Sequence, residues 1–412
     1  MLIFLITKDS KSILDNDLKK RIIKFNHFFN QNCGFFKYYM IKLFIYIEGS
    51  DYMGKLRVVS LFSGIGGFEN GFDNSKMKYE LVFSSEIDKY AVQTYSYNFS
   101  IFNMHGDIKQ ISEKDIPEHD LLCGGFPCQS FSVAGKQKGF EDKTRGTLFF
   151  DIIRIIKEKK TKYLFLENVK NLISHDHGNT IKTILKKISE CGYAFDITVI
   201  NSNEAGVPQN RERTYIVGVL NRKVEKFEDD KRNSKVTSIK HWANKEGLNT
   251  MNFFNHISIN INSKHICDIL EENVDSKYYL NSNKIHEYLN LIDKKQLNIK
   301  KQRKIVKDFD LPREIHNDLD RQRRVYSIYG ISPTLLARSD SPKIIFEENK
   351  ELKVRKLTPL ETLKLQGFDD KFVENIKKNG MSDTQLYKQA GNAVSPPVIT
   401  QIANAIMEML YE

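Results

Sequence analysis

The sequence has few cysteines, few prolines and no long hydrophobic run, and each scarcity argues against a class of protein. Five cysteines scattered over 412 residues are odd in number, which disfavours a disulfide framework and favours a reducing cytoplasm. Cys123 and Cys128 lack a second cysteine pair or spaced histidines, so no metal site is expected. The apolar run at residues 35–47 is interrupted by lysines and is too short to span a bilayer. We therefore expect a cytoplasmic protein without disulfides, metals or membrane spans.

The chain carries more positive than negative charge. The chain has 63 Lys and Arg against 52 Asp and Glu, a formal net charge of +11. A positive balance suits a polyanionic partner, because each neutralised phosphate releases condensed counterions. Many Lys-rich proteins carry such a charge for solubility alone, so the charge gives only mild support to a nucleic-acid partner.

Short apolar strand candidates alternate with amphipathic helix candidates from about residue 56 to residue 219. The expected strands cover residues 58–62, 80–84, 121–123, 163–166, 195–200 and 214–219. The expected helices cover residues 89–98, 148–157 and 180–189, with a final one at 397–410. This alternation predicts an α/β fold with a mostly parallel sheet and helices on both faces. Ligands of such sheets bind at the carboxyl ends of the strands.

The alternation is lost after residue 220, where the chain becomes polar and has no proline up to residue 310. We predict a catalytic domain at residues 53–220, completed by residues 385–412. A smaller recognition domain with its hinge is expected at residues 221–384. Residues 1–52 have no clear caps or turns, so we interpret them as an N-terminal extension and Met53 as the physiological start.

A glycine-rich turn follows the first strand, in the sequence Phe62-Ser-Gly-Ile-Gly-Gly. Because Glu69 stands where a G-x-G-x-x-G motif would have its last glycine, the turn alone is weak evidence for a nucleotide. Glu86 and Asp107 come at the ends of the next two strand candidates. Two such acids fit a ligand that has a ribose diol and an amino group. An NAD enzyme would also have the glycine-rich turn and the acid after the second strand, so these residues do not decide the reaction.

Cys128 is the candidate nucleophile. It follows an apolar strand, two glycines and Pro127, within Cys-Gly-Gly-Phe-Pro-Cys-Gln-Ser-Phe-Ser. A thiolate held on a rigid loop with a lowered pKa is a strong nucleophile. Most single cysteines are instead buried and inert, and we interpret Cys123 in that way.

Glu167 is the candidate acid, because it follows the apolar strand candidate Tyr163-Leu-Phe-Leu. Partial burial at a strand end would raise its pKa and let it donate a proton. Asn168 beside it could fix either the acid or the Pro127 loop. Of Arg211 and Arg213, one could reach a substrate and the other could orient Glu167.

Taken in order, these segments resemble the DNA (cytosine-5) methyltransferases of bacterial restriction–modification systems. The resemblance covers residues 56–402 except the central variable region. It includes the Phe62 turn, the Cys128 loop, Glu167-Asn-Val and Gln209-Asn-Arg-Glu-Arg. Two late segments also match, Arg355-Lys-Leu-Thr-Pro-Leu-Glu with Gln366-Gly-Phe, and Gln389-Ala-Gly-Asn-Ala-Val-Ser-Pro-Pro. Six motifs in the family's order make the resemblance specific.

The resemblance implies a Rossmann-like methyltransferase fold that binds S-adenosylmethionine. The residues that would line its site are Phe62, Gly64, Ile65, Gly66, Glu86, Ile87, Asp107, Ile108, Pro127, Leu148, Asn392 and Ala393. The family often has an aromatic residue where this chain has Ile87, so stacking on the adenine would be weaker. Cys128 would attack carbon 6 of a flipped cytosine, with Glu167, Arg211 and Arg213 as the other catalytic residues.

The same resemblance implies double-stranded DNA as the partner and a monomeric enzyme associated with the bacterial nucleoid. The loop at residues 129–147 would close over the DNA. The residues expected to contact DNA are Gln129, Ser132, Lys136, Arg145, Gln322, Arg324 and Thr334. Contacts of the arginines to phosphate alone are about as probable as base readout.

Three other readings share part of this evidence. RNA cytosine-5 methyltransferases have the same motifs, but the long basic variable region and the Pro-Cys-Gln context favour a DNA substrate. A DNA-binding regulator built on an inactive methyltransferase would not need the catalytic residues, all of which are present. An NAD-dependent dehydrogenase would share the sheet but would have no use for Cys128.

Overall fold

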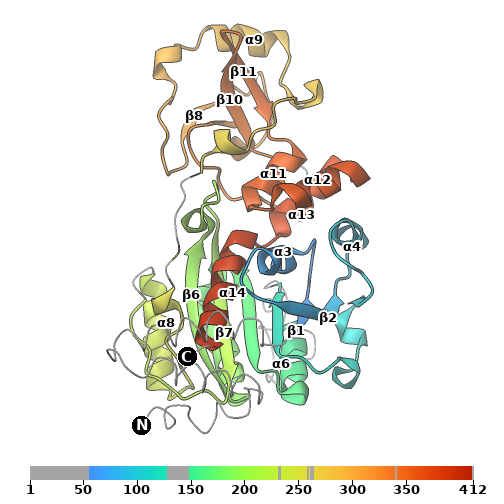
Figure 1. Cartoon of the computed structure of the whole chain (residues 1–412). Helices are drawn as coiled ribbons and strands as arrows, with labels where there is room; N and C mark the ends of the chain where they lie inside the picture. Colours follow the sequence, from blue (N-terminus) through green and yellow to red (C-terminus); the bar gives the residue numbers. More distant parts are fainter. Residues whose placement is uncertain are drawn as a thin grey trace, which may run out of the picture. The chain divides into compact units, whose positions relative to one another are not determined.

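A seven-stranded sheet organises most of the chain (Figure 1). The structure, a computed structural model, describes residues 55–127, 148–230, 233–257, 259, 264–338 and 341–410. The strand order is β3-β2-β1-β4-β5-β7-β6. The strands are β1 (Leu56–Leu61), β2 (Tyr79–Ser85), β3 (Met104–His105), β4 (Leu121–Gly125), β5 (Tyr163–Val169), β6 (Tyr193–Asn201) and β7 (Glu212–Leu220). Residues 1–52, which we interpreted as an extension, lie outside the described residues.

Six of these strands run in one direction, and β7 runs antiparallel to both of its neighbours, β5 and β6. The strands are apolar over most of their length because both faces of the sheet are covered. The predicted α/β class with a mostly parallel sheet is therefore confirmed.

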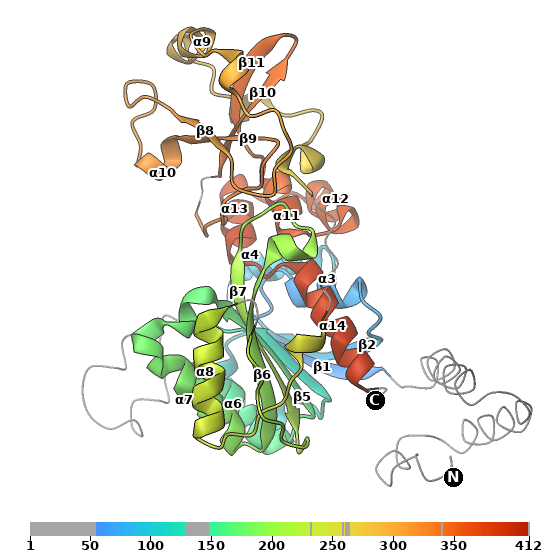
Figure 2. The same cartoon turned by 90° about the vertical axis from the view of Figure 1, so that its left-hand side faces the viewer.

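Helices cover both faces of the sheet (Figure 2). Apolar rows of α6 (Leu148–Lys159), α7 (Asn179–Glu190) and α8 (Ser234–Lys245) join the strands in one buried core. On the opposite face lie α3 (Gly67–Asp73) and α14 (Pro396–Leu410). Phe68 of α3 packs edge-on against Phe165 of β5, with ring centroids 5.1 Å apart. The predicted helices thus form, with ends within a few residues of those expected.

A second sheet of four strands has the order β11-β10-β9-β8. The strands are β8 (Lys307–Asp310), β9 (Arg324–Ser327), β10 (Lys343–Glu348) and β11 (Glu351–Lys356). This sheet has its own core, in which Val325, Ile345 and Val354 pack with apolar residues of α9 (Asn283–Asn290).

Three further helices connect the second sheet to the first. They are α11 (Pro359–Gln366), α12 (Asp370–Asn379) and α13 (Asp383–Asn392), and their apolar residues share a core with Ile65 and Ala91. The remaining described α-helices are α4 (Lys89–Ser96) and α10 (Asp320–Arg323). A buried pair of hydrogen bonds, both 2.7 Å, joins Arg355 of β11 to Glu361 of α11. The two sheets are therefore linked by packed helices and a buried ion pair.

The segment that follows β7 packs on the first sheet, although the sequence placed the start of the second domain at residue 221. Its helix α8 contributes Val236, Ile239 and Ala243 to the first core. The Phe195 N–H of β6 donates to Asn249 O at 3.1 Å, and Met251 N–H donates back to Phe195 O at 3.0 Å. The strand–helix alternation therefore ends near residue 220, whereas the residues that follow still belong to the core of the first sheet.

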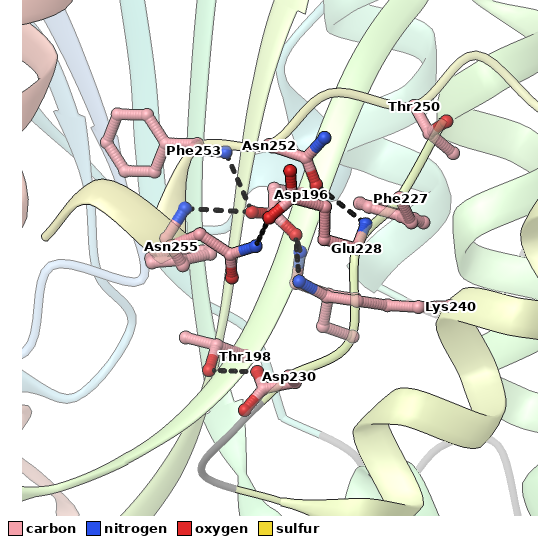
Figure 3. A network of polar contacts seen from close by, with 12 residues as sticks. Asp196, Thr198, Phe227, Glu228, Asp230, Lys240, Thr250, Asn252, Phe253 and Asn255 are labelled. Carbon is pink, nitrogen blue, oxygen red and sulfur yellow. Dashed lines mark hydrogen bonds and ion pairs between the residues drawn. The ribbon is translucent and has the colours of Figure 1, made fainter. Parts of the chain in front are cut away.

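A buried ion pair fastens this segment to β6, as Figure 3 shows. Asp196 of β6 and Lys240 of α8 are fully buried, with 2.8 Å between Oδ1 and Nζ. The other Asp196 oxygen accepts the N–H groups of Phe253 and Phe254, both at 2.8 Å. The Lys240 ammonium also lies 4.9 Å from the centroid of the Phe227 ring. One carboxylate thus holds a helix and a loop on the outermost strand.

Asp196→Ala is expected to lower the free energy of unfolding by about 3–5 kcal/mol, because the buried Lys240 charge loses its counterion. Two backbone N–H groups also lose their acceptor. Urea denaturation checks this value. The matched control is Asp229→Ala, which removes an exposed pair with His241 and should change the value by no more than about 1 kcal/mol. Equal effects of the two variants would contradict the role assigned to Asp196.

Candidate active site

The glycine-rich turn lies at the carboxyl end of β1 and leads into α3. Phe62 and Gly64 both have φ of 57°, and Gly66 has φ of 91°. A side chain at Gly66 would place its Cβ 2.3 Å from the Phe99 ring, so glycine is required there. The Gly64 N–H donates to Glu86 Oε2 at 2.9 Å. The turn is thus held against the end of the neighbouring strand β2.

Two acids stand at the ends of β2 and β3, where the sequence predicted them. Glu86 Oε1 accepts the N–H groups of Ile87 and Asp88, both at 2.8 Å. Asp107 accepts the N–H of Lys109 at 3.0 Å. These bonds fix the orientation of both carboxylates.

Among the described residues, open space borders this edge of the sheet. None of their atoms lies within 4 Å of a Cβ added to Gly106, and a Cβ at Gly64 would meet only Phe62 O, at 4.0 Å. Ile87, which follows Glu86 in sequence, leaves 74% of its surface exposed. Oriented carboxylates beside open space and an uncovered apolar side chain suit a ligand with hydroxyl groups and a flat ring.

The other residues predicted to bind a cofactor differ in how far their side chains are exposed. The side chains of Ile65 and Ile108 are buried in hydrophobic cores, so only their backbones could meet a ligand. Leu148 is half-buried at the start of α6. Pro127 and Asn392 are exposed, and Ala393 is half-buried.

Glu167 and Arg213 form a buried pair at the carboxyl end of the sheet. Glu167 Oε1 lies 3.1 Å from Arg213 Nε, and their side chains are 10% and 12% exposed. Burial raises the pKa of Glu167, and the positive charges of Arg213 and Arg211 oppose that rise. The carboxyl group can therefore hold a proton more readily than an exposed glutamate.

The position of Glu167 corrects one detail of the sequence interpretation. The acid was expected just after its strand, but β5 continues to Val169 because its pairing with β7 extends to Val169 and Arg213. Glu167 is thus fixed by pairing on both sides, opposite Gly125 of β4 and Tyr215 of β7. A Cβ at Gly125 would lie 3.1 Å from Glu167 Oε2, so a side chain there would crowd the acid.

Asn168 binds the loop that leads to Cys128. Its Nδ2 donates to Phe126 O at 2.7 Å, which is one of the two contacts that the sequence left open. Residues 128–147 lie outside the described part of the chain. Predictions for Cys128, Gln129, Ser132, Lys136 and Arg145 therefore fall outside the described residues.

Arg211 has partners other than Glu167. Its guanidinium is buried and donates to Gly391 O at 3.0 Å and to Ala393 O at 2.7 Å. Leu335 O accepts a longer bond of 3.4 Å. Of these two arginines, Arg213 forms the ion pair with the acid, and Arg211 binds the carboxyl end of α13 at Gly391 and the following residue Ala393.

Gln209 and Glu69 are two buried residues to which the sequence reasoning gave no role. Gln209 donates to Leu365 O and accepts from Leu335 N–H, both at 2.9 Å. Gln209 therefore joins the segment just before β7 to α11 and to the segment around residue 335. Glu69 lies in the first turn of α3 at 1% exposure, and burial raises its pKa to about 7. The signal for Gln209 was its place at the start of the motif Gln209-Asn-Arg-Glu-Arg.

Three residues predicted to contact DNA line one small pocket. Gln322, Arg324 and Thr334 come from two segments about ten residues apart in sequence and border a cavity of about 70 Å³. The Thr334 hydroxyl donates to Asn210 O, next to Arg211, at 2.5 Å. The pocket is thus connected to the segment that carries Arg211 and Arg213.

In the described ranges, no helix has the length and apolarity needed to cross a bilayer. The same residues contain no group of three or more His, Cys, Asp or Glu side chains arranged to hold a metal ion.

Residues 56–408 match the family of C-5 cytosine-specific DNA methylases. The chain is 40% identical over 358 residues to the type II methyltransferase M1.ScrFI of Lactococcus lactis subsp. cremoris, covering 86% of this chain and 79% of that one. It is also 40% identical over 363 residues to the type II methyltransferase M.SsoII of Shigella sonnei, covering 87% and 81%.

Solved structures show the same fold at lower identity. The Entamoeba histolytica methyltransferase EhMeth aligns with a TM-score of 0.59 at 19% identity, covering 87% of this chain and 100% of that chain. The S. pombe Dnmt2 methyltransferase aligns with a TM-score of 0.57 at 17% identity, covering 86% and 99%.

Proposed function

The chain belongs to the C-5 cytosine-specific DNA methylases, and we propose that it methylates carbon 5 of a cytosine flipped out of a specific double-stranded DNA sequence. The activity of the family, methylation of DNA cytosine, is that of this enzyme. The observation that carries the finer proposal is the Glu167–Arg213 pair, one residue from the Asn168 amide that binds Phe126 O, two residues before Cys128 in sequence.

S-adenosylmethionine is the proposed methyl donor, and the carboxyl edge of β1 to β3 fits it. The carboxylate of Glu86 would bind its ribose, and that of Asp107 would bind the amino group of its adenine. The exposed side chain of Ile87 would cover one face of the adenine ring. Asn392 and the Phe62 turn would complete the site. When bound, this cofactor supplies an electrophilic methyl group on its sulfonium sulfur.

Cys128 is the proposed nucleophile and Glu167 the proposed acid. Carbon 5 of cytosine is a weak nucleophile, so the Cys128 thiolate first forms a bond to carbon 6. The displaced electron pair is stabilised as Glu167 gives its proton to ring nitrogen 3, and carbon 5 then accepts the methyl group. Solvent water then takes the proton from carbon 5, and the electron pair of that C–H bond expels the Cys128 thiolate from carbon 6. Ring nitrogen 3 returns its proton to Glu167, so the ring, the thiolate and the acid are all restored.

Arg213 holds Glu167 in position during these steps. Its guanidinium also donates to Glu212 O at 2.9 Å, so two of its nitrogens are held. Arg211 fixes the backbone at Gly391 and Ala393 through its guanidinium. We therefore assign Arg213 and Arg211 as positioning residues.

DNA would be bound by the region that contains the second sheet, here proposed to begin after residue 257 because residues 225–254 pack on the first sheet. Gln322, Arg324 and Thr334 would lie against the DNA, and the loop that begins with Gln129 would close over it. Flipping a base costs on the order of a few kcal/mol, which such contacts would offset. We also propose that the methylation protects DNA from a cognate restriction endonuclease.

The purified enzyme is expected to transfer tritiated methyl groups from S-adenosylmethionine to plasmid DNA and not to transfer RNA. Acid-precipitable counts on each nucleic acid measure this. The control is the same plasmid isolated from cells that express the enzyme, which should accept few further methyl groups because its sites are already modified. Transfer to RNA alone would overturn the choice of substrate.

A further inference from the structure

The first turn of α3 buries a carboxyl group that the proposed reaction does not use. Glu69 is 1% exposed, and neither of its carboxyl oxygens has a hydrogen bond of ordinary geometry with the described residues. The hydroxyl oxygens of Ser60 and Tyr95 are also buried and also lack such a bond. Buried polar groups are normally paired, so three unpaired ones together mark a place that apolar packing alone does not explain.

The surroundings of Glu69 favour its uncharged form. The titratable side chains that interact with it come from four elements and are Asp73 of α3, Tyr79 of β2, Tyr95 of α4 and Cys123 of β4. None of them carries a positive charge. Burial raises the pKa of Glu69 to about 7, and the hydroxyl groups of Ser60 and Tyr95 oppose the rise. The protonated acid can donate a hydrogen bond to a hydroxyl oxygen, whereas the carboxylate is a buried charge without a counterion.

The two residues whose hydroxyl groups interact with Glu69 also contact the glycine-rich turn. Ser60 O accepts the hydroxyl of Ser63, a residue of that turn, at 3.0 Å. The Tyr95 ring lies 3.3 Å from the position that a Cβ on Gly66 would take. The acid therefore lies behind the turn, between the strand that leads into it and a helix that packs against it.

The same helix, α4, begins at the residues that border the proposed ribose site. Its N-cap Asp88 accepts the N–H of Tyr90 at 3.0 Å, and the N–H of Asp88 donates to Glu86 Oε1 at 2.8 Å. The other oxygen of Glu86 accepts the Gly64 N–H at 2.9 Å. A shift of α4 against β1 would therefore disturb both the turn and the carboxylate that is bonded to it.

We propose that Glu69 is a positioning residue for the methyl donor: in its protonated form it joins Ser60 to Tyr95 and so holds the glycine-rich turn in the shape that binds S-adenosylmethionine. Loss of that proton places a charge in the core, and the turn and α4 then move apart to hydrate it. The proposal rests on the proposed function, because it takes S-adenosylmethionine as the ligand of the turn. It concerns the affinity for the methyl donor and not the transfer step that Glu167 serves.

The test is the dissociation constant of S-adenosylmethionine, measured by calorimetry on the enzyme without DNA at intervals from about pH 6 to about pH 8.5. The wild-type constant should rise by about 10- to 30-fold over this range, because a group whose pKa is about 7 gives up its proton there. Glu69→Gln, whose amide stays uncharged, should bind as the wild type does at the lowest pH and should lack this rise. Other titrating groups of the protein and of the methyl donor are common to both enzymes, so the difference between the two profiles isolates Glu69.

Two further variants complete the test. Glu80→Gln, which changes an exposed carboxyl group on β2, is the matched control and should keep the wild-type profile. Tyr95→Phe keeps the ring but removes a hydroxyl group that favours the carboxylate, so the rise of its dissociation constant should begin at a higher pH. Parallel profiles for the wild type and Glu69→Gln would overturn the proposal, and if Glu69→Gln does not fold, an unshifted profile of Tyr95→Phe would do so. Failure of the wild-type enzyme to bind S-adenosylmethionine at any pH would instead reject the proposed function itself.

Discussion

Cys128→Ala is expected to lose methyl transfer to DNA by on the order of 10⁴-fold or more, as when other enzymes lose their nucleophile. Without the thiolate, carbon 5 of cytosine keeps its low reactivity. Binding of DNA should persist, because the proposed contacts of Gln322, Arg324 and Thr334 are untouched. Filter-based transfer assays and gel shifts measure the two properties on the same preparations.

The control for this variant is Cys267→Ala, which changes a half-buried cysteine in a short helical turn that follows His265. It should methylate DNA at the wild-type rate. DNA that contains 5-fluorocytosine at the target should trap the wild-type enzyme as a covalent adduct in the presence of S-adenosylmethionine. Mass spectrometry should place that adduct on Cys128, and an adduct on any other cysteine would refute the mechanism.

Glu167→Gln is expected to slow methyl transfer by roughly 10²- to 10⁴-fold, the usual contribution of a general acid. The amide can still donate a hydrogen bond but cannot give up a proton to ring nitrogen 3. Because burial raises the pKa of Glu167, the wild-type rate should fall as rising pH removes its proton. The variant should lack this fall. Single-turnover rates over a range of pH test both statements.

Glu212→Gln is the matched control for the acid. Glu212 is also near the start of β7 but is paired with Lys170 at the surface, with 37% of its side chain exposed. Its variant should keep the wild-type rate and pH profile. If Glu167→Gln were within a few-fold of wild type at every pH, Glu167 would be only a structural residue.

The sequence predicted the strands and the residues at their carboxyl ends because both depend on local patterns. The run Tyr163-Leu-Phe-Leu predicts a buried strand by itself, and the parallel sheet then places Glu167 opposite Gly125, at the end of the strand that precedes Cys128 in sequence. The reversed direction of β7 was not predicted. Its signal was the short connection from Asn201 to Glu212, which can join only antiparallel neighbours.

Long-range polar contacts could not be predicted in the same way. Asp196 and Lys240 are 44 positions apart and neither has a distinctive neighbour, so nothing in the sequence marks them as a buried pair. The division of roles between Arg211 and Arg213 was also undetermined, because both precede the strand predicted at residues 214–219 and nothing in their spacing separates them. Only the tertiary structure shows that one meets Glu167 and the other meets backbone carbonyls.

Residues 249–251, which cover part of the outer side of β6, affect the behaviour of the enzyme at high concentration. This nine-residue strand is bonded to β7 along one side, and residues 249–251 occupy part of its other side. An uncovered strand of this length and apolarity would offer its amide and carbonyl groups to another molecule. Variants that release the cover, Asp196→Ala among them, should therefore self-associate and precipitate in a concentration-dependent manner under conditions where the wild-type enzyme stays dispersed.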